Sequence, residues 1–196
     1  AVGVDAMTTG NHVWDKREIF AYIDREPRLI RPINMPEGTS GRGMVTVTND
    51  AGLRLTVINA MTNLFMAPNE PMFPALSACL DTIQLKEDTD AIMIDVHGEA
   101  TSEKNATGLL YDGRVSMVVG THTHIPTADH RILPKGTAYM TDVGMCGDYT
   151  SVIGMNAEAA IGRFIGEDGG KLSVAMGEPS LSGIIVDTDD DTGLAT

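Results

Sequence analysis

The chain lacks the cysteine pattern that marks several classes of small stable protein. Only 2 of its 196 residues are cysteine, and aromatic residues make up 5% of the chain. Cys79 and Cys146 lie in unrelated contexts and form no Cys-x-x-Cys motif, which argues against a disulfide scaffold and against a structural zinc ribbon. This cysteine usage is typical of a reducing compartment, and we predict a cytoplasmic protein.

Basic residues and long apolar runs are also scarce. Lys and Arg number 14 against 27 Asp and Glu, which gives a formal net charge of −13. Because so acidic a protein repels phosphates, we expect no stable binding to nucleic acid or to an anionic membrane. No apolar run approaches the length of a membrane span, and no signal peptide is visible. A phosphate-bearing substrate would need a local cationic centre, which a metal ion could provide.

The composition is otherwise globular. Hydrophobic residues make up 42% of the chain, which is enough apolar material for a core. The length favours one domain, and we expect residues 1–196 to form it. The predicted strands and helices follow one another in a mixed α/β order, which predicts sheet layers covered by helices.

Hydrophobic periodicity and turn residues give the predicted elements. The predicted strands span residues 2–9, 44–48, 53–60, 90–97, 115–124, 131–133, 137–142, 171–176 and 183–187. Predicted helices span residues 16–24, with Phe20 and Ile23 facing inward, residues 73–86, residues 102–110, and a last helix from its N-cap Asn156 through Phe164.

Four of the five histidines follow predicted strands. His12 follows the first strand, His97 ends the strand 90–97, and His122 and His124 end the strand 115–124. Side chains alternate along a strand, so His122 and His124 should point to the same face. Sites in layered α/β folds gather where strands end. Because imidazoles are good ligands for a borderline metal ion, the sequence predicts a metal site at a shared mouth.

Asn11 and His12 are neighbours, so on an extended chain their side chains would diverge. A natural division gives the Asn11 carbonyl oxygen to a metal and leaves His12 free to act on substrate. A free imidazole near neutral pKa suits the protonation of a leaving alkoxide. The alternative for His12 is an N-cap or hydrogen-bonding role at the start of a helix.

Other polar residues have more ordinary interpretations. Glu99 and Glu103 are either hydrogen-bond partners of the histidines or part of a solvated helix start. Cys146 lies in a glycine-rich loop with no base paired to it, so we predict a small packing residue. We expect Cys79 in the core and His130 on the surface.

The chain resembles the YmdB-like branch of the calcineurin-like metallophosphoesterases in four motifs. In chain order they are Gly-Asn-His-x-Trp-Asp at 10–15, Asp-Val-His-Gly-Glu-Ala-Thr-Ser-Glu-Lys at 95–104, Val-Gly-Thr-His-Thr-His at 119–124 and Thr-Asp-Val-Gly-Met at 141–145. Gly-Asn-His is shared by the wider superfamily, whereas the longer strings are specific to this branch. The resemblance covers nearly the whole chain.

This resemblance implies an α/β fold, a layered metallophosphoesterase-type β-sandwich flanked by helices, with two divalent metal ions. Iron or manganese are the implied metals, and zinc would also suit the ligands. Asn11, His97 and His122 would hold one metal, His124 would help to hold the other, and His12 would be the catalytic acid. The implied substrates are small phosphodiesters or nucleotides, such as 2′,3′-cyclic nucleotides. A homo-oligomer is compatible with the sequence.

One part of the family pattern has no counterpart in this sequence. The family begins with a strand that carries a metal-binding Asp, followed by a Glu that bridges the metals, and Asp5 lies in the wrong context to replace them. We therefore expect an N-terminally truncated domain that lacks the first βα unit, binds at most one metal tightly and catalyses poorly. An inactive fragment or a metal-binding regulatory protein is the alternative. A single-zinc amidohydrolase-like enzyme is disfavoured, because its His-x-His motif opens the first strand of a barrel.

Overall fold

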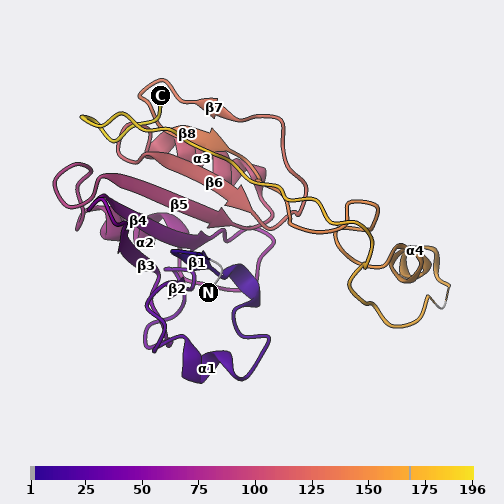
Figure 1. Cartoon of the computed structure of the whole chain (residues 1–196). Helices are drawn as coiled ribbons and strands as arrows, with labels where there is room; N and C mark the ends of the chain where they lie inside the picture. Colours follow the sequence, from indigo (N-terminus) through magenta and orange to yellow (C-terminus); the bar gives the residue numbers. More distant parts are fainter. Residues whose placement is uncertain (1–2, 168) are drawn as a thin grey trace.

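A six-stranded mixed sheet forms the centre of the computed structural model, which describes residues 3–167 and 169–196 (Figure 1). The strand order is β3-β4-β5-β6-β8-β7. The strands are β3 (Met44–Thr48), β4 (Arg54–Met61), β5 (Ala91–His97), β6 (Met117–Thr121), β7 (Arg131–Ile132) and β8 (Ala138–Met140). β4, β5, β6 and β8 run parallel, while β3 and β7 pair antiparallel at the two edges. The carboxyl ends of four strands therefore meet at one edge of the sheet.

Two helices cover one face of this sheet. They are α2 (Met72–Leu80) and α3 (Thr101–Leu110), which lie behind the strands in Figure 1. Met72, Leu76 and Leu80 recur every four residues on α2, and all three are buried in the same core cluster as Ile94 of β5. This apolar face fixes the helix layer and leaves the strand ends free for polar residues.

The fit of α3 against β8 depends on a glycine. A Cβ atom on Gly108 would lie only 2.5 Å from Cδ2 of the Tyr139 ring. Since no side chain fits in that space, the helix backbone can lie directly against the buried tyrosine. This close packing brings another residue of α3, Lys104, into the interior at the strand ends.

The N-terminal part forms a separate two-stranded parallel sheet from β1 (Met7–Thr8) and β2 (Leu29–Ile30). Between them lie the 3₁₀ helix η1 (Gly10–His12) and the short α1 (Ile19–Tyr22). The predicted strand 2–9 and helix 16–24 are thus longer than the observed elements, and residue 2 lies outside the described residues. Glu18 makes no side-chain cap to α1, and short uncapped helices are only marginally stable.

Of the two residues predicted to face inward in the helix 16–24, one is buried and one is exposed. Ile23 is fully buried against Val13 and Leu29, as predicted. Phe20 is 51% exposed, so its predicted burial is wrong. Its ring stacks on Trp14 with centroids 4.5 Å apart, and this contact holds it at the surface.

The C-terminal part leaves the sheet as an arm that carries α4 (Ala157–Ile165) and then returns (Figure 1). Asn156 caps α4 as predicted, because its Oδ1 accepts the backbone N–H of Ala159 at 3.1 Å. The predicted strands 171–176 and 183–187 are wrong. In the described part of the tail only isolated bridges form, such as Met155 with Val174. Val174 is 67% exposed, so no apolar surface is present to hold a strand there.

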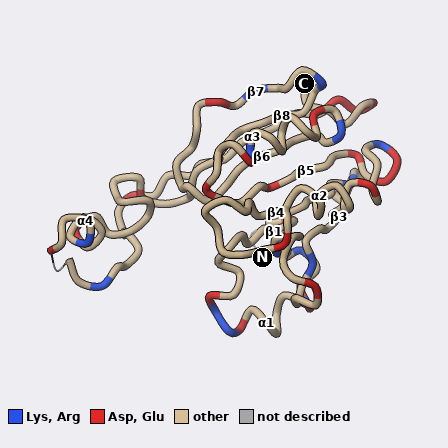
Figure 2. Tube along the Cα trace, turned by 180° about the vertical axis from the view of Figure 1, so that it is seen from behind, with Lys and Arg blue, Asp and Glu red and all other residues tan. Residues whose placement is uncertain are grey.

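The mixed α/β prediction and the predicted hairpin over 44–60 are confirmed. Among the described helices, none has the length and apolar character needed to cross a bilayer. Figure 2 shows charged residues of both signs gathered in loops at the end of the sheet away from α4. At that end Asp90 forms ion pairs with Arg54 at 3.3 Å and with Lys86 at 3.5 Å.

Candidate metal centre

The sheet register aligns the ends of β5 and β6. His97 is the last residue of β5, Thr121 is the last residue of β6, and the two are register partners. Asp95 lies two residues before His97, and it pairs with Asn59 of β4. Residues two apart on a strand share a face, so Asp95 and His97 point to the same side of the sheet.

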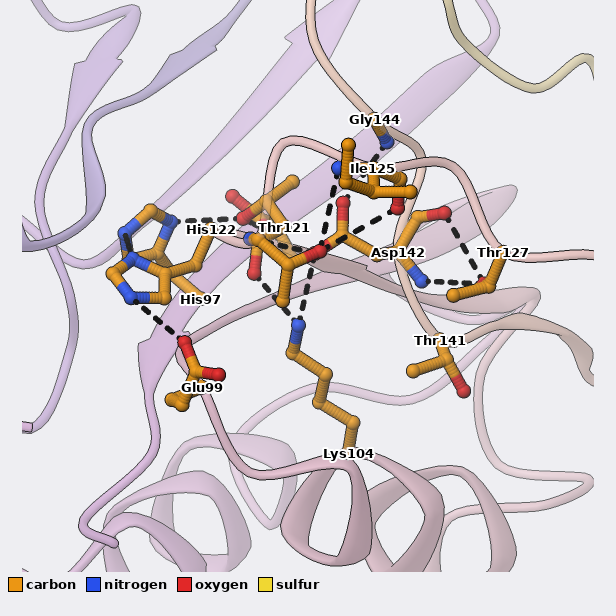
Figure 3. A network of polar contacts seen from close by, with 12 residues as sticks. His97, Glu99, Lys104, Thr121, His122, Ile125, Thr127, Thr141, Asp142 and Gly144 are labelled. Carbon is orange, nitrogen blue, oxygen red and sulfur yellow. Dashed lines mark hydrogen bonds and ion pairs between the residues drawn. The ribbon is translucent and has the colours of Figure 1, made fainter. Parts of the chain in front are cut away.

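Three predicted metal ligands meet at this edge. The Nε2 atom of His97 lies 2.6 Å from Oδ1 of Asn11 and 3.2 Å from Nδ1 of His122. The two imidazole rings stand edge to face, with centroids 4.9 Å apart and an interplanar angle of 75° (Figure 3). The structure therefore brings together Asn11, His97 and His122 from three separate segments of the chain.

A glycine allows Asn11 to reach this position. Gly10 has a φ of +65°, and a Cβ atom there would lie 2.5 Å from the His97 ring. Only glycine adopts this conformation without a steric penalty and leaves room for the imidazole. The Gly-Asn pair in the first motif thus places the amide of residue 11 against the end of β5.

A chain of hydrogen bonds behind His97 suits the tautomer with its proton on Nδ1. Its Nδ1 atom lies 2.9 Å from Oγ1 of Thr121, and that hydroxyl donates to Oδ1 of Asp95 at 2.7 Å. Because the hydroxyl proton points to Asp95, the Thr121 oxygen can accept the Nδ1–H of His97, which is the tautomer that a metal on Nε2 requires. The lone pair of His97 Nε2 is then directed toward Asn11 and His122, as a metal ligand requires. Sequence reasoning missed Asp95 and Thr121, although their spacing from the histidines was visible.

The environment keeps both histidines neutral. Burial lowers the pKa of His97 from 6.5 to about 3, with further contributions from charge on His122, Lys104 and His12. Burial also lowers the pKa of His122, against the opposing effect of the Glu99 carboxylate. Neutral imidazole is the form that binds metal ions, so no proton must leave before a metal binds at neutral pH.

The two late histidines occupy a turn and not a strand. β6 ends at Thr121, so the predicted strand 115–124 is too long, and strand alternation cannot place His122 and His124. Their φ angles are +106° and +68°, in the region that favours glycine, and such residues typically cost about 1–3 kcal/mol each. We call residues 122–124 the histidine turn.

The histidine turn nevertheless directs both side chains to one place. His97, His122 and His124 line the same cleft of about 270 Å³, together with Thr121 and Asp95. The Nδ1–H of His124 donates to the backbone carbonyl of Ile153 at 2.7 Å. That bond leaves the other ring nitrogen of His124 free to contact a ligand in the cleft.

His12 lies at the surface end of η1. Its Nδ1 atom lies 2.8 Å from Oδ2 of Asp15, and the side chains of both residues are more than 60% exposed. The N-cap role considered for His12 is not observed among the described helices. The hydrogen-bonding role is observed, as the contact with Asp15. Asp15 was not singled out by sequence reasoning, although it closes the first motif.

The two glutamates of the second motif have different partners. Oε2 of Glu99 lies 3.5 Å from Nε2 of His122, which makes it a neighbour of the site. Glu103 accepts hydrogen bonds from the backbone N–H groups of Asn63 at 3.0 Å and Leu64 at 2.9 Å. Glu103 therefore anchors the loop after β4 and is not a partner of the histidines.

Three residues with ordinary interpretations can also be placed. His130 is exposed and Cys79 is partly buried against the core, as predicted. Burial raises the pKa of the Cys79 thiol to about 11. Cys146 is exposed, so its predicted packing role is wrong; its loop lies at the base of the arm, where the core no longer covers it.

Comparison with known proteins places this site in a family. The YmdB-like protein family matches the chain over residues 1–196. The chain belongs to this family. A 2′,3′-cyclic-nucleotide 2′-phosphodiesterase of Bacillus subtilis strain 168 is 50% identical over 190 residues, which cover 97% of this chain and 71% of that relative.

Two solved structures share the YmdB-like fold. The crystal structure of a novel phosphatase from Mycoplasma pneumoniae matches with a TM-score of 0.86 and 34% identity, over 99% of this chain and 70% of the other. A hypothetical protein from Thermus thermophilus matches with a TM-score of 0.82 and 42% identity, over 90% of this chain and 68% of the other.

The donor atoms at the strand ends fit a metal ion of the kind that the family implies. Ligands with bonds of about 2.0–2.2 Å to one metal stand roughly 3 Å apart, and the His97 contacts of 2.6 and 3.2 Å are close to that spacing. Imidazole nitrogen with amide oxygen suits iron, manganese or zinc. No group of three His, Cys, Asp or Glu side chains suited to a metal occurs within the described residues, so the cluster at His97 consists of two imidazoles and the Asn11 amide.

Proposed function

We propose that this protein is a metal-dependent phosphodiesterase of small phosphodiesters, with 2′,3′-cyclic nucleotides as its substrate class. The observation that carries the proposal is the meeting of Asn11 and His122 at Nε2 of His97, on a cleft at the strand ends. Membership of the YmdB-like family and the printed activity of the Bacillus relative support it.

In this proposal the chain supplies imidazole and amide ligands and no carboxylate. Asn11, His97 and His122 hold one divalent metal, and His124, on the same cleft, helps to hold a second. Bound metal ions would neutralise charge on the phosphate and lower the pKa of a water molecule. Such a cation is needed because the chain has a net charge of −13 and would otherwise repel a phosphodiester.

His12 has the role of general acid. Hydrolysis breaks one P–O bond to a ribose oxygen, and the departing alkoxide needs a proton. The contact between Asp15 and Nδ1 of His12 orients the ring and leaves Nε2 to deliver that proton. Exposure of His12 fits this role, because the donor must reach a substrate that enters from solvent.

A metal-binding protein without turnover is the second candidate, and one observation favours it. The proposed ligands Asn11, His97, His122 and His124 are all neutral groups. Two dications a few ångströms apart repel one another strongly, and neutral ligands compensate that repulsion poorly. With these four ligands alone, we expect one tight metal per chain, as the sequence predicted.

The test starts from protein stripped with a chelator and reloaded separately with Mn²⁺, Fe²⁺ or Zn²⁺. Hydrolysis of 2′,3′-cyclic AMP and of bis(p-nitrophenyl) phosphate is then followed, together with metal content after dialysis. We expect turnover that requires the added metal and disappears with chelator. Bound metal with no turnover of either substrate would favour the second candidate, and absence of bound metal would reject both.

A further inference from the structure

Two buried charges beside the candidate metal centre have no part in the proposed chemistry. Lys104 of α3 is 1% exposed and Asp142, which follows β8, is fully buried. Their Nζ and Oδ2 atoms lie 3.1 Å apart (Figure 3). Charged residues are rarely buried so completely, and burial of two charges requires a large desolvation cost.

The ion pair holds the peptide groups on both sides of His122. Lys104 Nζ donates to the carbonyl oxygen of Thr121 at 2.8 Å. Asp142 Oδ2 accepts the backbone N–H of Thr123 at 3.0 Å. The first group belongs to the peptide before the His122 Cα and the second to the peptide after it. Fixing both peptide planes fixes both backbone dihedral angles of His122.

His122 needs such a restraint. Its φ of +106° is unfavourable for a residue with a side chain, so the surroundings must hold it. If the turn relaxed to a negative φ, the imidazole would rotate away from Nε2 of His97. Asp142 also accepts the N–H of Gly144 through Oδ1 at 2.9 Å, and Gly144 lines the same cleft as the histidines.

The strand before the turn is shaped to admit the lysine. A Cβ atom on Gly120 would lie 1.7 Å from the carbonyl oxygen of Thr141 and 2.8 Å from Cδ of Lys104. Any side chain at position 120 would therefore separate β6 from the segment that carries Asp142. The glycine, the lysine and the aspartate form one fitted unit beneath the histidine turn.

We propose that the Lys104–Asp142 ion pair is a positioning device that holds the histidine turn in its metal-binding shape, and that it contributes little to net stability. The inference rests on the proposed function of the site. Buried ion pairs often stabilise a fold no better than uncharged residues of similar shape. Hydrogen bonds from this pair to two consecutive peptide groups give a geometric role that apolar residues of similar shape cannot reproduce.

The test replaces both charges together with Lys104→Met/Asp142→Leu, because either single change would leave an unpaired buried charge. The control is Lys86→Met/Asp90→Leu at the other end of the sheet. We expect both variants to melt within a few degrees of the wild type. Mn²⁺ affinity should fall about 10–100-fold in the first variant alone, as for changes in residues that orient metal ligands. kcat should fall with it.

A readout without metal separates this inference from the proposed function. In the metal-free wild type, the Thr123 amide should be protected from hydrogen exchange, and the first variant should lose that protection while β5 keeps it. If the wild type binds no Mn²⁺, the proposed function fails but this comparison still tests the positioning role. A first variant that folds with wild-type exchange and Mn²⁺ affinity would overturn the inference. So would one that does not fold, because the pair would then be a stabilising element.

Discussion

The two ends of the central sheet each carry an aspartate paired with a lysine, but in opposite settings. At the carboxyl ends of the strands, the side chains of Lys104 and Asp142 are 1% and 0% exposed. At the other end, Asp90 and its partners Arg54 and Lys86 have side chains 24–37% exposed. Solvent screens the second set, so its pairs contribute little, whereas the first has lost its hydration.

The energetically unfavourable features of the fold are concentrated at one end of the sheet. The carboxyl end combines the buried charges with two strained histidines and with imidazoles kept neutral by burial. The opposite end has the ordinary charged loops of a protein surface (Figure 2). Strain and perturbed pKa values cluster at functional sites, so the comparison supports the proposed site at the carboxyl end.

The largest effect is expected from His97→Ala. His97 is the imidazole that contacts both Asn11 and His122, so its loss should remove tight metal binding. kcat/KM should fall by about 10³-fold or more, which corresponds to about 4 kcal/mol of lost transition-state stabilisation. Metal analysis after dialysis and the phosphodiesterase assay measure this. Asp90→Asn is the control from the other end and should keep both values, while full metal content in His97→Ala would contradict the assignment.

His12→Ala has the next largest expected effect. It separates proton donation by His12 from metal binding by the residues at the strand ends. Metal content should stay near that of the wild type, while kcat for 2′,3′-cyclic AMP falls roughly 10²–10⁴-fold. A nitrophenyl ester has a better leaving group and needs less protonation, so its loss should be much smaller. Asp15→Asn should act in the same direction with a smaller effect. Equal losses for both substrates, or a loss of metal, would count against the general-acid role.

Thr121→Val tests the hydrogen-bond chain behind His97. The substitution keeps the shape but removes the hydroxyl between His97 Nδ1 and Asp95. Metal affinity should weaken about 10–100-fold, because the imidazole is no longer oriented. Titration calorimetry with Mn²⁺ measures the change. Thr121→Ser keeps a hydroxyl and should retain most of the metal affinity. If the serine and valine variants bind Mn²⁺ equally, the hydrogen bonds between His97, Thr121 and Asp95 do not orient the imidazole.

The last prediction concerns the pH dependence of stability and not activity. In the folded protein the pKa of His97 is about 3, below its ordinary 6.5, so the unfolded chain binds a proton at higher pH than the folded one. The stability that neutral His97 provides is present above about pH 6.5 and is lost as the pH falls toward about 3. This group contributes at most about 1.4 kcal/mol per pH unit in that window.

Urea denaturation of metal-free protein at several pH values follows this effect. His97→Gln, which cannot titrate, should give a shallower decline of the unfolding free energy below about pH 6.5. Asp90→Asn should leave the slope above about pH 5 unchanged, since an aspartate whose pKa is lowered on folding takes up its proton below that range in both the folded and the unfolded chain. Identical slopes for the wild type and His97→Gln would show that burial does not perturb His97.

The sequence predicted the sheet well where apolar strands alternate with glycine or proline turns. β5, the hairpin of β3 and β4, and the pair of β7 and β8 all appear where expected. It failed where no packing partner exists, as in the tail beyond residue 170, and where a ring contact overrides helix periodicity, as at Phe20. Local patterns cannot show whether a distant surface is available to cover a strand.

The structure shows a geometry at the candidate site that the sequence could not. Asn11, His97 and His122 lie in contact, and His124 lines the same cleft as the other two histidines. The positive φ angles of His122 and His124 could not be predicted from the sequence, because Thr-His-Thr-His contains no glycine. Lys104 lies in the predicted helix 102–110, and the sequence gives no sign that it is buried. Only the approach of α3 to Gly120 and Asp142 shows that its side chain points inward.

The most direct test of the central claim measures hydrolysis of 2′,3′-cyclic AMP by one preparation, first free of metal and then loaded with Mn²⁺. The wild type and His97→Ala are measured side by side, with metal content recorded for each. The account predicts turnover only in the loaded wild type, with loss of both bound metal and activity in His97→Ala. Turnover by metal-free protein, or equal turnover by the two loaded proteins, would contradict a metal-dependent phosphodiesterase site at the carboxyl end of the sheet.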